Sequence, residues 1–357
     1  MSKILIISQG SRATAHYEGR GMYTPDAESF EAFMRSAVNP QGIEYDFVSI
    51  DDDVEGFESC HPKHCNDLAE LIENRYGDYD GFMVLRGAQY ADYVGASLAF
   101  SLQGNHKPIL IGCAEGSFSN PVTGISSFMA RGLMYLSTEG QKPEKRSDIS
   151  ILTGDIIVKA VDATLFPDGT GRYYSRTDQA FPVEKLLYVG DPQDIPHRIG
   201  GLQRQPIDEA LNVIVQEGFG DYSEQWKFIS EMPLDGVVLK TNTHGQFHMP
   251  EHNQFTFLDR LSKRGIPVIL ADTMTHGVVD GTFSGNVLNN VFEAKTMSVP
   301  VAQAKLRYAI SAAGGDLDKL KNIMQTEYFG EIPEHRQLLR AKRPEVGYPG
   351  GRAAIPA

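Results

Sequence analysis

The stretch YDGFMVLRGAQYADYVGASLAFSLQGNHKPILIGCAEG, from Tyr79 to Gly116, decides the fold. It predicts a strand that ends before Gly87, then a loop, a helix, and a second strand that begins after Pro108. In an open α/β sheet, ligands bind at the loops that follow the carboxyl ends of the strands. Residues 86–90, RGAQY, are therefore where we expect chemistry.

The composition is that of a soluble globular protein. With 357 residues, 41% of them hydrophobic, the chain is long enough for two domains. A net charge of −13 argues against a nucleic-acid partner, because its phosphates would be repelled. The first residues are too short for a signal-peptide core, and no segment approaches the ~20 apolar residues of a membrane span. Only three cysteines are present, which indicates no disulfide framework and a reducing cytoplasm.

Strand and helix patterns alternate along the chain, which predicts mainly parallel sheets with right-handed crossovers. The expected strands are 4–8, 45–50, 82–85, 109–112, 210–215, 236–240 and 266–271, with a hairpin or edge pair within 150–166. The first expected helix begins near Pro25, with the proline in its first turn. A further helix ends at Leu102, and the others cover 66–75, 125–136, 223–232, 254–264 and 301–313.

One segment stands out as a linker. Residues 190–206, GDPQDIPHRIGGLQRQP, are rich in Gly, Pro and polar side chains. The linker separates a larger N-terminal α/β domain (1–189) from a smaller C-terminal α/β domain (207–331). The remaining residues, 332–357, are rich in Pro, Gly and Arg and are expected to form an extended or disordered tail.

Several of these stretches resemble motifs of the bacterial-type (type I and II) L-asparaginases. YDGFMVLRG from Tyr79 is similar to the family's YDGFVVxxG, and KPILIG from Lys107 is similar to its KPVVLTG. In the second half, DGVVL from Asp235, RGIPV from Arg264 and AKL from Ala304 follow in the family's order. The resemblance covers residues 4 to about 325.

The resemblance implies a two-domain asparaginase-like α/β fold and an amidohydrolase whose active sites lie between subunits. A homodimer or homotetramer and a small-molecule ligand follow from it as expectations. We expect no cofactor.

The family acts through two threonines, and a serine replaces the first of them here. The family's TGGTI reads SQGSR in this chain, so Ser11 stands at the nucleophile position. An activated serine can perform the same acyl chemistry. Tyr17 or Tyr23 corresponds to the family's mobile tyrosine, and the sequence leaves both open.

The second constellation is lost. The family's GTDT reads GAQY, so Ala88 replaces the threonine and Gln89 replaces the aspartate that binds the substrate's α-ammonium group. The latter change removes a charge-assisted hydrogen bond worth roughly 1.5–3 kcal/mol. Our alignment places Leu165 where the family has its activating lysine, with Lys159 nearby as the alternative. These coordinated losses argue against ordinary L-asparagine hydrolysis.

The remaining candidates are substrate-binding residues. They are Gly10, Asp52, Asp53, Gly87, Ala88, Gln89 and Cys113. Backbone N–H groups of the 87–89 loop could form an oxyanion hole. The acidic run that contains Asp52 and Asp53 favours a cationic or hydroxyl-bearing ligand, or else forms a turn or helix start.

The histidine and cysteine clusters are poor metal sites. CHPKHC from Cys60 has suitable ligand types but neither the Cys-x2-Cys nor the His-x3-His spacing. His244, His248 and His252 recur every four residues, but the intervening glycine and proline predict a loop. We therefore expect no metal.

Two functional hypotheses follow from the sequence. The first is a divergent amidohydrolase that acts through Ser11 on a small amide or amino-acid-like substrate other than free L-asparagine. The second is a catalytically inactive homologue that binds a ligand or a protein partner.

Overall fold

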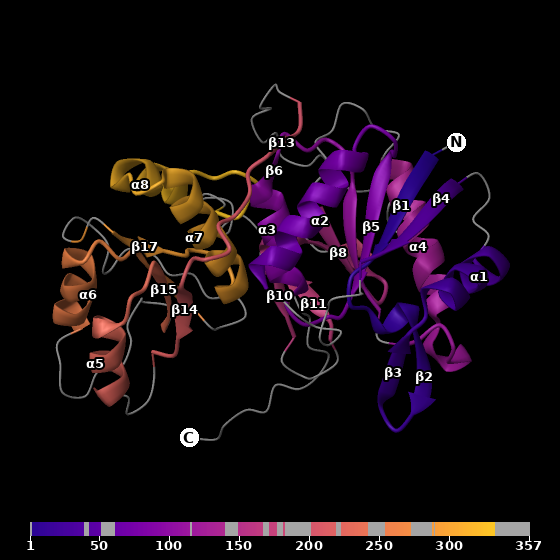
Figure 1. The fold of residues 1–357 in the computed structure, drawn as a ribbon, viewed down its shortest axis with the longest axis horizontal. Coiled ribbons are helices and arrows are strands. Elements are labelled where there is room, and N and C mark those ends of the chain that lie inside the picture. The colour runs from indigo at the N-terminus through magenta and orange to yellow at the C-terminus, as the bar shows by residue number, and fades with distance from the viewer. Residues whose placement is uncertain are drawn as a thin grey trace, which may run out of the picture.

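The computed structural model describes residues 2–38, 43–50, 61–114, 116–139, 149–166, 171–176, 181–182, 201–218, 223–241, 254–272, 288 and 290–332. Figure 1 shows two lobes, an N-terminal one in indigo to magenta and a C-terminal one in orange to yellow. Each is built on its own main sheet, of seven and four strands respectively. The prediction of a two-domain α/β fold is confirmed.

The N-terminal sheet is mainly parallel. Its order is β12 (Phe181–Pro182), β9 (Ile156–Lys159), β8 (Ile149–Thr153), β7 (Ile109–Cys113), β5 (Gly81–Arg86), β1 (Ser2–Ser8) and β4 (Ile43–Ser49). The strands from β8 to β4 run parallel, while β9 turns back against β8 and β12 pairs antiparallel with β9. The hairpin expected within 150–166 is therefore present.

Helices cover both faces of this sheet. One face is covered by α1 (Ala27–Ala37) and α4 (Ile125–Glu139), and the other by α2 (Pro62–Arg75) and α3 (Ala91–Ser101). Two helix starts differ from expectation. Pro25 ends a strand rather than opening α1, because the Asp26 side chain caps the helix by accepting from the Ser29 N–H. The second helix begins four residues early, since Pro62 occupies a first-turn position that needs no N–H donor.

Short elements complete the N-terminal domain. They are three strand pairs, namely the hairpin of β2 (Ala15–Gly19) with β3 (Met22–Pro25), β10 (Ala163–Leu165) with β11 (Tyr173–Ser175), and β6 (Leu102–Gln103) with β13 (Gln203–Arg204). Three short 3-10 helices are also present: η1 (Arg12–Thr14), η3 (Pro121–Thr123) and η4 (Ala160–Asp162). The β2–β3 hairpin projects from the lower edge of the domain in Figure 1.

The C-terminal sheet is parallel, in the order β14 (Val213–Gln216), β15 (Gly236–Thr241), β16 (Val268–Asp272) and β17 (Val291–Glu293). Its helices are α5 (Ser223–Glu231), α6 (Gln254–Lys263), α7 (Val299–Ala313) and α8 (Leu317–Gln325). A core around the buried Trp226 packs α5 and α6 on one face. The other face packs on α7, which in turn packs on α3 of the N-terminal domain.

Aromatic side chains hold this domain interface, and a buried ion pair lies next to them within the C-terminal domain. Phe100 of α3 lies 5.7 Å, centroid to centroid, from both Tyr308 of α7 and Phe329. Beneath them, Lys305 Nζ lies 2.7 Å from Glu331 Oε1, and both side chains are fully buried. Burial lowers the pKa of Lys305, and the adjacent Glu331 carboxylate opposes that change. The lysine of the AKL motif is therefore half of a buried salt bridge.

The exact domain boundaries stay predictions, because residues 183–200 lie outside the described part of the chain. The end of the predicted linker is anchored on the N-terminal domain. Arg204 Nε donates to Glu73 Oε2 at 2.7 Å, and the Ile207 N–H donates to the Asn66 side chain at 3.1 Å. Among the described residues, none of the helices has the length and apolar character needed to cross a membrane.

Candidate active site

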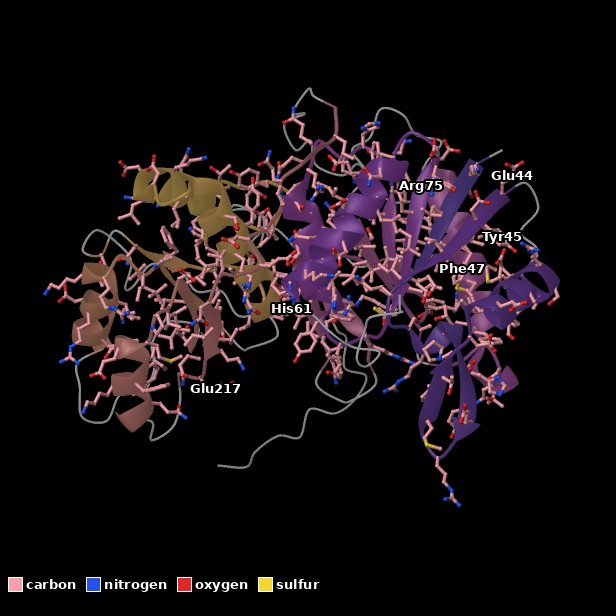
Figure 2. The ribbon with its side chains drawn as sticks, in the orientation of Figure 1. Glu44, Tyr45, Phe47, His61, Arg75 and Glu217 are labelled. Carbon is pink, nitrogen blue, oxygen red and sulfur yellow. The ribbon has the colours of Figure 1, made fainter. Side chains whose placement is uncertain are left out.

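The candidate site lies at the carboxyl edge of the N-terminal sheet, where the loops of neighbouring parallel strands meet. The loop after β1 contains Ser11, the loop after β5 contains Gln89, and β7 ends at Cys113. Figure 2 shows which end of the domain this edge is. Glu44 and Arg75 lie toward the upper end, and His61, at the start of α2, lies lower, toward the carboxyl ends of the strands. The Gln9 N–H donates to the Leu85 carbonyl at 2.9 Å, so the first two loops begin side by side.

Ser11 is held in a buried hydroxyl cluster. Its side chain is fully buried, and its Oγ accepts from the Ala13 N–H at 3.1 Å as the cap of η1. Its carbonyl accepts from the Thr14 hydroxyl at 3.0 Å, and that hydroxyl also contacts Ser8 Oγ at 2.8 Å. This bond is the side-chain cap of η1, and activation of Ser11 as a nucleophile would also need a base beside it.

The two candidate tyrosines face each other on the β2–β3 hairpin. Tyr17 and Tyr23 are cross-strand partners whose ring centroids lie 5.1 Å apart. The guanidinium of Arg12, the residue after Ser11, lies 5.3 Å from the Tyr23 ring centroid. Tyr17 is 36% exposed, whereas Tyr23 is half-buried. Tyr23 therefore contacts Arg12, the residue after Ser11, and Tyr17 packs on the Tyr23 ring.

The second loop is clamped by Tyr173, a residue that sequence reasoning missed. The Tyr173 hydroxyl donates to the Ala88 carbonyl at 2.5 Å and accepts from the Ala91 N–H at 3.1 Å. Burial raises the pKa of Tyr173 far above its usual range, so the phenol stays protonated and can donate. No local pattern signals this contact, because Tyr173 and Ala88 are separated by 85 residues.

Ala88 is half-buried beside the backbone of residue 171. A Cβ placed on Gly171 would lie 3.1 Å from the Ala88 Cβ, which shows how closely that backbone covers the methyl group. Leu165 pairs with Tyr173, so β10 and β11 lie beside the second loop; the assignment of Leu165 to the family's lysine position remains a prediction. Lys159 pairs with Ser150, near the amino end of β8, and so lies toward the opposite edge of the sheet.

A buried polar cluster lies beneath the two loops. Arg86 is the last residue of β5 rather than a loop residue, and it is only 1% exposed. Its Nη1 donates to Gln9 Oε1 at 3.1 Å, and Gln9 Nε2 donates to the His64 carbonyl at 2.8 Å. Burial lowers the pKa of His64, with His61, Lys63 and Arg86 acting in the same direction. This cluster ties β1 and β5 to the first turn of α2.

Asp92 and Cys113 belong to the same buried layer. Burial raises the pKa of the Asp92 carboxyl to about 6, although the Tyr93 N–H and the Tyr173 hydroxyl partly oppose the change. Burial likewise raises the pKa of the Cys113 thiol to about 12. The thiol is therefore neutral at physiological pH and is a poor nucleophile.

The other predicted binding residues are spread over the edge. Gly10 and Gly87 are buried, Ala88 is half-buried and Gln89 is exposed. Asp52, Asp53, Cys60, His244, His248 and His252 lie outside the described residues. In the part of the chain that the structure describes, no group of three or more His, Cys, Asp or Glu residues could hold a metal ion.

A hydroxyl-bearing loop after the first strand lies beside a glycine-led loop on the next parallel strand of a two-domain α/β fold, which is the arrangement that the resemblance to asparaginases implies. Comparisons with known proteins agree. Residues 3–160 match the family model described as Asparaginase, N-terminal. L-asparaginase 1 of Escherichia coli K12 is 24% identical over 295 residues, which cover 76% of this chain and 80% of the relative. Over residues 3–160 the chain is thus similar to the N-terminal domain of asparaginases.

Solved structures share the fold over nearly the whole chain. The thermostable L-asparaginase from Thermococcus kodakarensis superposes with a TM-score of 0.72 at 18% identity, covering 92% of this chain and 99% of its own. L-asparaginase I from Vibrio cholerae gives 0.73 at 17% identity, covering 93% and 99%. A probable cytoplasmic L-asparaginase from Campylobacter jejuni gives 0.70 at 14% identity, covering 92% and 100%.

Proposed function

We propose that the protein is a divergent amidohydrolase that uses Ser11 as its nucleophile on a small amide or amino-acid-like substrate other than free L-asparagine. The observation that carries the proposal is the setting of Ser11, at the carboxyl end of β1, with the Ala13 N–H donated to its oxygen. The tyrosine pair on the adjoining hairpin supports it.

In the proposed reaction, Ser11 Oγ attacks the carbonyl carbon of the amide. Its proton passes to the hydroxyl oxygen of Tyr23 or Tyr17, the two candidates, while that hydroxyl gives its own proton to the amide nitrogen. The C–N bond then breaks, the amine leaves with a proton, and an acyl ester remains on Ser11. Water hydrolyses this ester and regenerates the serine. N–H groups of Gly87, Ala88 and Gln89 are proposed to stabilise the oxyanion.

The other substrate contacts are proposed at Gly10, Gln89 and Cys113, and at Asp52 and Asp53. A neutral Gln89 amide in place of a carboxylate favours a substrate without an ammonium group at that position, because an ammonium group would meet a neutral amide there and not an opposite charge. This is the reason for excluding free L-asparagine as the preferred substrate.

The test is a screen for ammonia or amine release from a panel of primary and secondary amides, with L-asparagine and L-glutamine included. Ser11→Ala should abolish turnover of any amide that the protein hydrolyses, by at least the ~10³-fold that loss of a nucleophile costs. Ser36→Ala, an exposed serine on α1, is the matched control and should turn over normally. Turnover that survives Ser11→Ala would eliminate the proposed nucleophile, and L-asparagine hydrolysis at rates above all other amides would overturn the substrate class.

The second candidate function is an inactive homologue that retains a ligand-binding or protein-interaction role. The packing of Ala88 under Gly171 and the placement of Lys159 toward the opposite edge favour it, since neither residue then offers second-site chemistry. Ligand binding by calorimetry with no product after prolonged incubation would support this function over the first.

Assembly and location complete the proposal. We propose a homodimer or homotetramer in the cytoplasm, as the family resemblance implies and as the description of the Campylobacter jejuni protein suggests for location. Light scattering coupled to size exclusion tests the assembly, and a monomer at micromolar concentration would contradict it.

A further inference from the structure

Arg176 reaches from the N-terminal domain into the C-terminal domain. It directly follows β11 and is only 5% exposed. Its Nε donates to the Thr296 carbonyl at 2.6 Å, two residues before the cap of α7 in the C-terminal domain. Burial lowers the pKa of Arg176, while Tyr174, Asp272 and Asp162 oppose the change. Because Asp162 belongs to the N-terminal domain and Asp272 to the C-terminal one, both domains balance the charge of this arginine.

The strand before Arg176 also carries the side chain that holds the second loop of the candidate site. The hydroxyl of Tyr173 bridges the Ala88 carbonyl and the Ala91 N–H. This strand, β11, is three residues long and pairs with β10 in a two-stranded sheet. A two-stranded ribbon is only marginally stable by itself, so its position depends on the contacts that its side chains make. The place of the Tyr173 hydroxyl therefore depends on how the end of β11 is held.

The end of β11 is held on both domains. On the N-terminal domain, the Ser175 hydroxyl donates to the Asp162 carboxylate, and the Arg176 N–H donates to the Asp162 carbonyl at 3.0 Å. On the C-terminal domain, the Arg176 guanidinium contacts Thr296, whose own hydroxyl donates to the Glu331 carbonyl at 3.1 Å. A continuous chain of hydrogen bonds thus runs from the C-terminal domain to β11.

We propose that Arg176 is a positioning residue, which fixes β11 on the C-terminal domain so that Tyr173 holds the turn from Ala88 to Ala91 in place. Its consequence for catalysis rests on the proposed function, in which N–H groups of this loop stabilise the oxyanion. Displaced donors weaken the transition state more than the bound substrate, so the loss belongs in kcat and not in KM.

Hydrogen exchange of Arg176→Met measures the positioning without any substrate. Methionine keeps a long apolar side chain and removes the donors and the charge. We expect amides of residues 87–94 to exchange about tenfold faster, while amides of β1 do not change. Arg172→Met is the matched control, because Arg172 is an exposed arginine directly before β11. It should leave exchange at residues 87–94 within about twofold.

A double variant tests whether Arg176 acts through Tyr173. If it does, Arg176→Met combined with Tyr173→Phe should exchange at residues 87–94 no faster than Tyr173→Phe alone, because the contact to be positioned is already lost. Additive effects of the two substitutions would overturn the inference. So would unchanged exchange at residues 87–94 in Arg176→Met, or an equal effect in Arg172→Met.

Arg176→Lys is the conservative variant, since it keeps the charge and a donor but not the planar fork of the guanidinium. It should restore part of the protection, with exchange at residues 87–94 about threefold faster than in the unchanged protein. If Arg176→Met does not fold, Arg176→Lys is compared with Arg172→Lys in the same measurement, and equal exchange in the two would overturn the inference.

Turnover separates the positioning from the proposed chemistry. For any amide that the protein hydrolyses, Arg176→Met should lower kcat about tenfold and leave KM unchanged. A raised KM with unchanged kcat would overturn the catalytic consequence of Arg176. Faster exchange at residues 87–94 in a protein that hydrolyses no amide would refute only the proposed function.

Discussion

Removing the Tyr173 hydroxyl tests whether a single side chain holds the second loop. In Tyr173→Phe the Ala88 carbonyl loses a donor at 2.5 Å and the Ala91 N–H loses its acceptor at 3.1 Å. The Ala91 N–H keeps only a 3.4 Å contact to the Ala88 carbonyl, which is at the weak end of hydrogen-bond geometry. Since an unsatisfied buried polar group costs about 1–3 kcal/mol, we expect the free energy of unfolding to fall by about 2 kcal/mol.

Urea unfolding measures that change, and hydrogen exchange locates it. Peptides covering residues 87–94 should exchange faster in Tyr173→Phe, while peptides from β1 should not change. Tyr45→Phe is the matched control, because Tyr45 is a half-exposed tyrosine on β4, at the far edge of the sheet, and its change should stay within about 0.5 kcal/mol. If both variants lose the same stability, and exchange at 87–94 is unchanged, Tyr173 does not clamp the loop.

Three other predictions concern buried or strained groups. Lys305→Met should lower the unfolding free energy by about 3–5 kcal/mol, because it leaves the buried Glu331 carboxylate without its cation. The double variant Lys305→Met with Glu331→Gln should recover part of this loss. Equal losses in the single and the double variant would contradict a stabilising ion pair. The pKa of Asp92 is raised in the folded state, so its contribution to stability is complete below about pH 4 and is lost as the pH rises through about 6. Asp92→Asn should remove about 3 kcal/mol of this pH dependence of the unfolding free energy, measured by urea titration at several pH values. Parallel pH profiles of the variant and the unchanged protein would refute this prediction. Tyr90→Gly should raise the unfolding free energy by up to about 1 kcal/mol, because relief of the left-handed backbone strain exceeds the entropic cost of glycine. A lower unfolding free energy in this variant would show that packing of the Tyr90 ring contributes more than the strain costs.

The framework of the fold could be predicted from sequence because it rests on short-range patterns. Buried parallel strands appear as apolar runs, and the runs ending at Ser8, Leu85 and Gly112 all lie in the N-terminal sheet, within a residue of their predicted ends. The exposed hairpin β2–β3 was missed because its strands are polar and carry no alternating apolar pattern. Arg86 was assigned to a loop because a charged residue after an apolar run usually marks a strand end, whereas here it is buried within the strand.

The site depends on contacts that no local pattern encodes. Tyr173 reaches Ala88 across 85 residues, and Lys305 meets Glu331 across 26. Ser11 and the tyrosine candidates could be selected from the sequence because they follow the first strand directly. Their burial and partners could not, since these depend on how η1 and the hairpin pack. The sequence pattern does not show whether they perform catalysis, and amide turnover by the Ser11→Ala variant tests it.

The loop GAQY has Ala88 and Gln89 where the resemblance to asparaginases implies a threonine and an aspartate. Ala88 has no reactive group, and the backbone at Gly171 covers its methyl. If the loop had no remaining role, mutation would be free to relax Tyr90 from its left-handed conformation, which costs roughly 1–2 kcal/mol in a residue with a Cβ. Instead Tyr173 enforces that conformation from both sides. The strained turn is therefore held by a contact from β11, and Tyr173→Phe is the variant that measures how far its conformation depends on that contact.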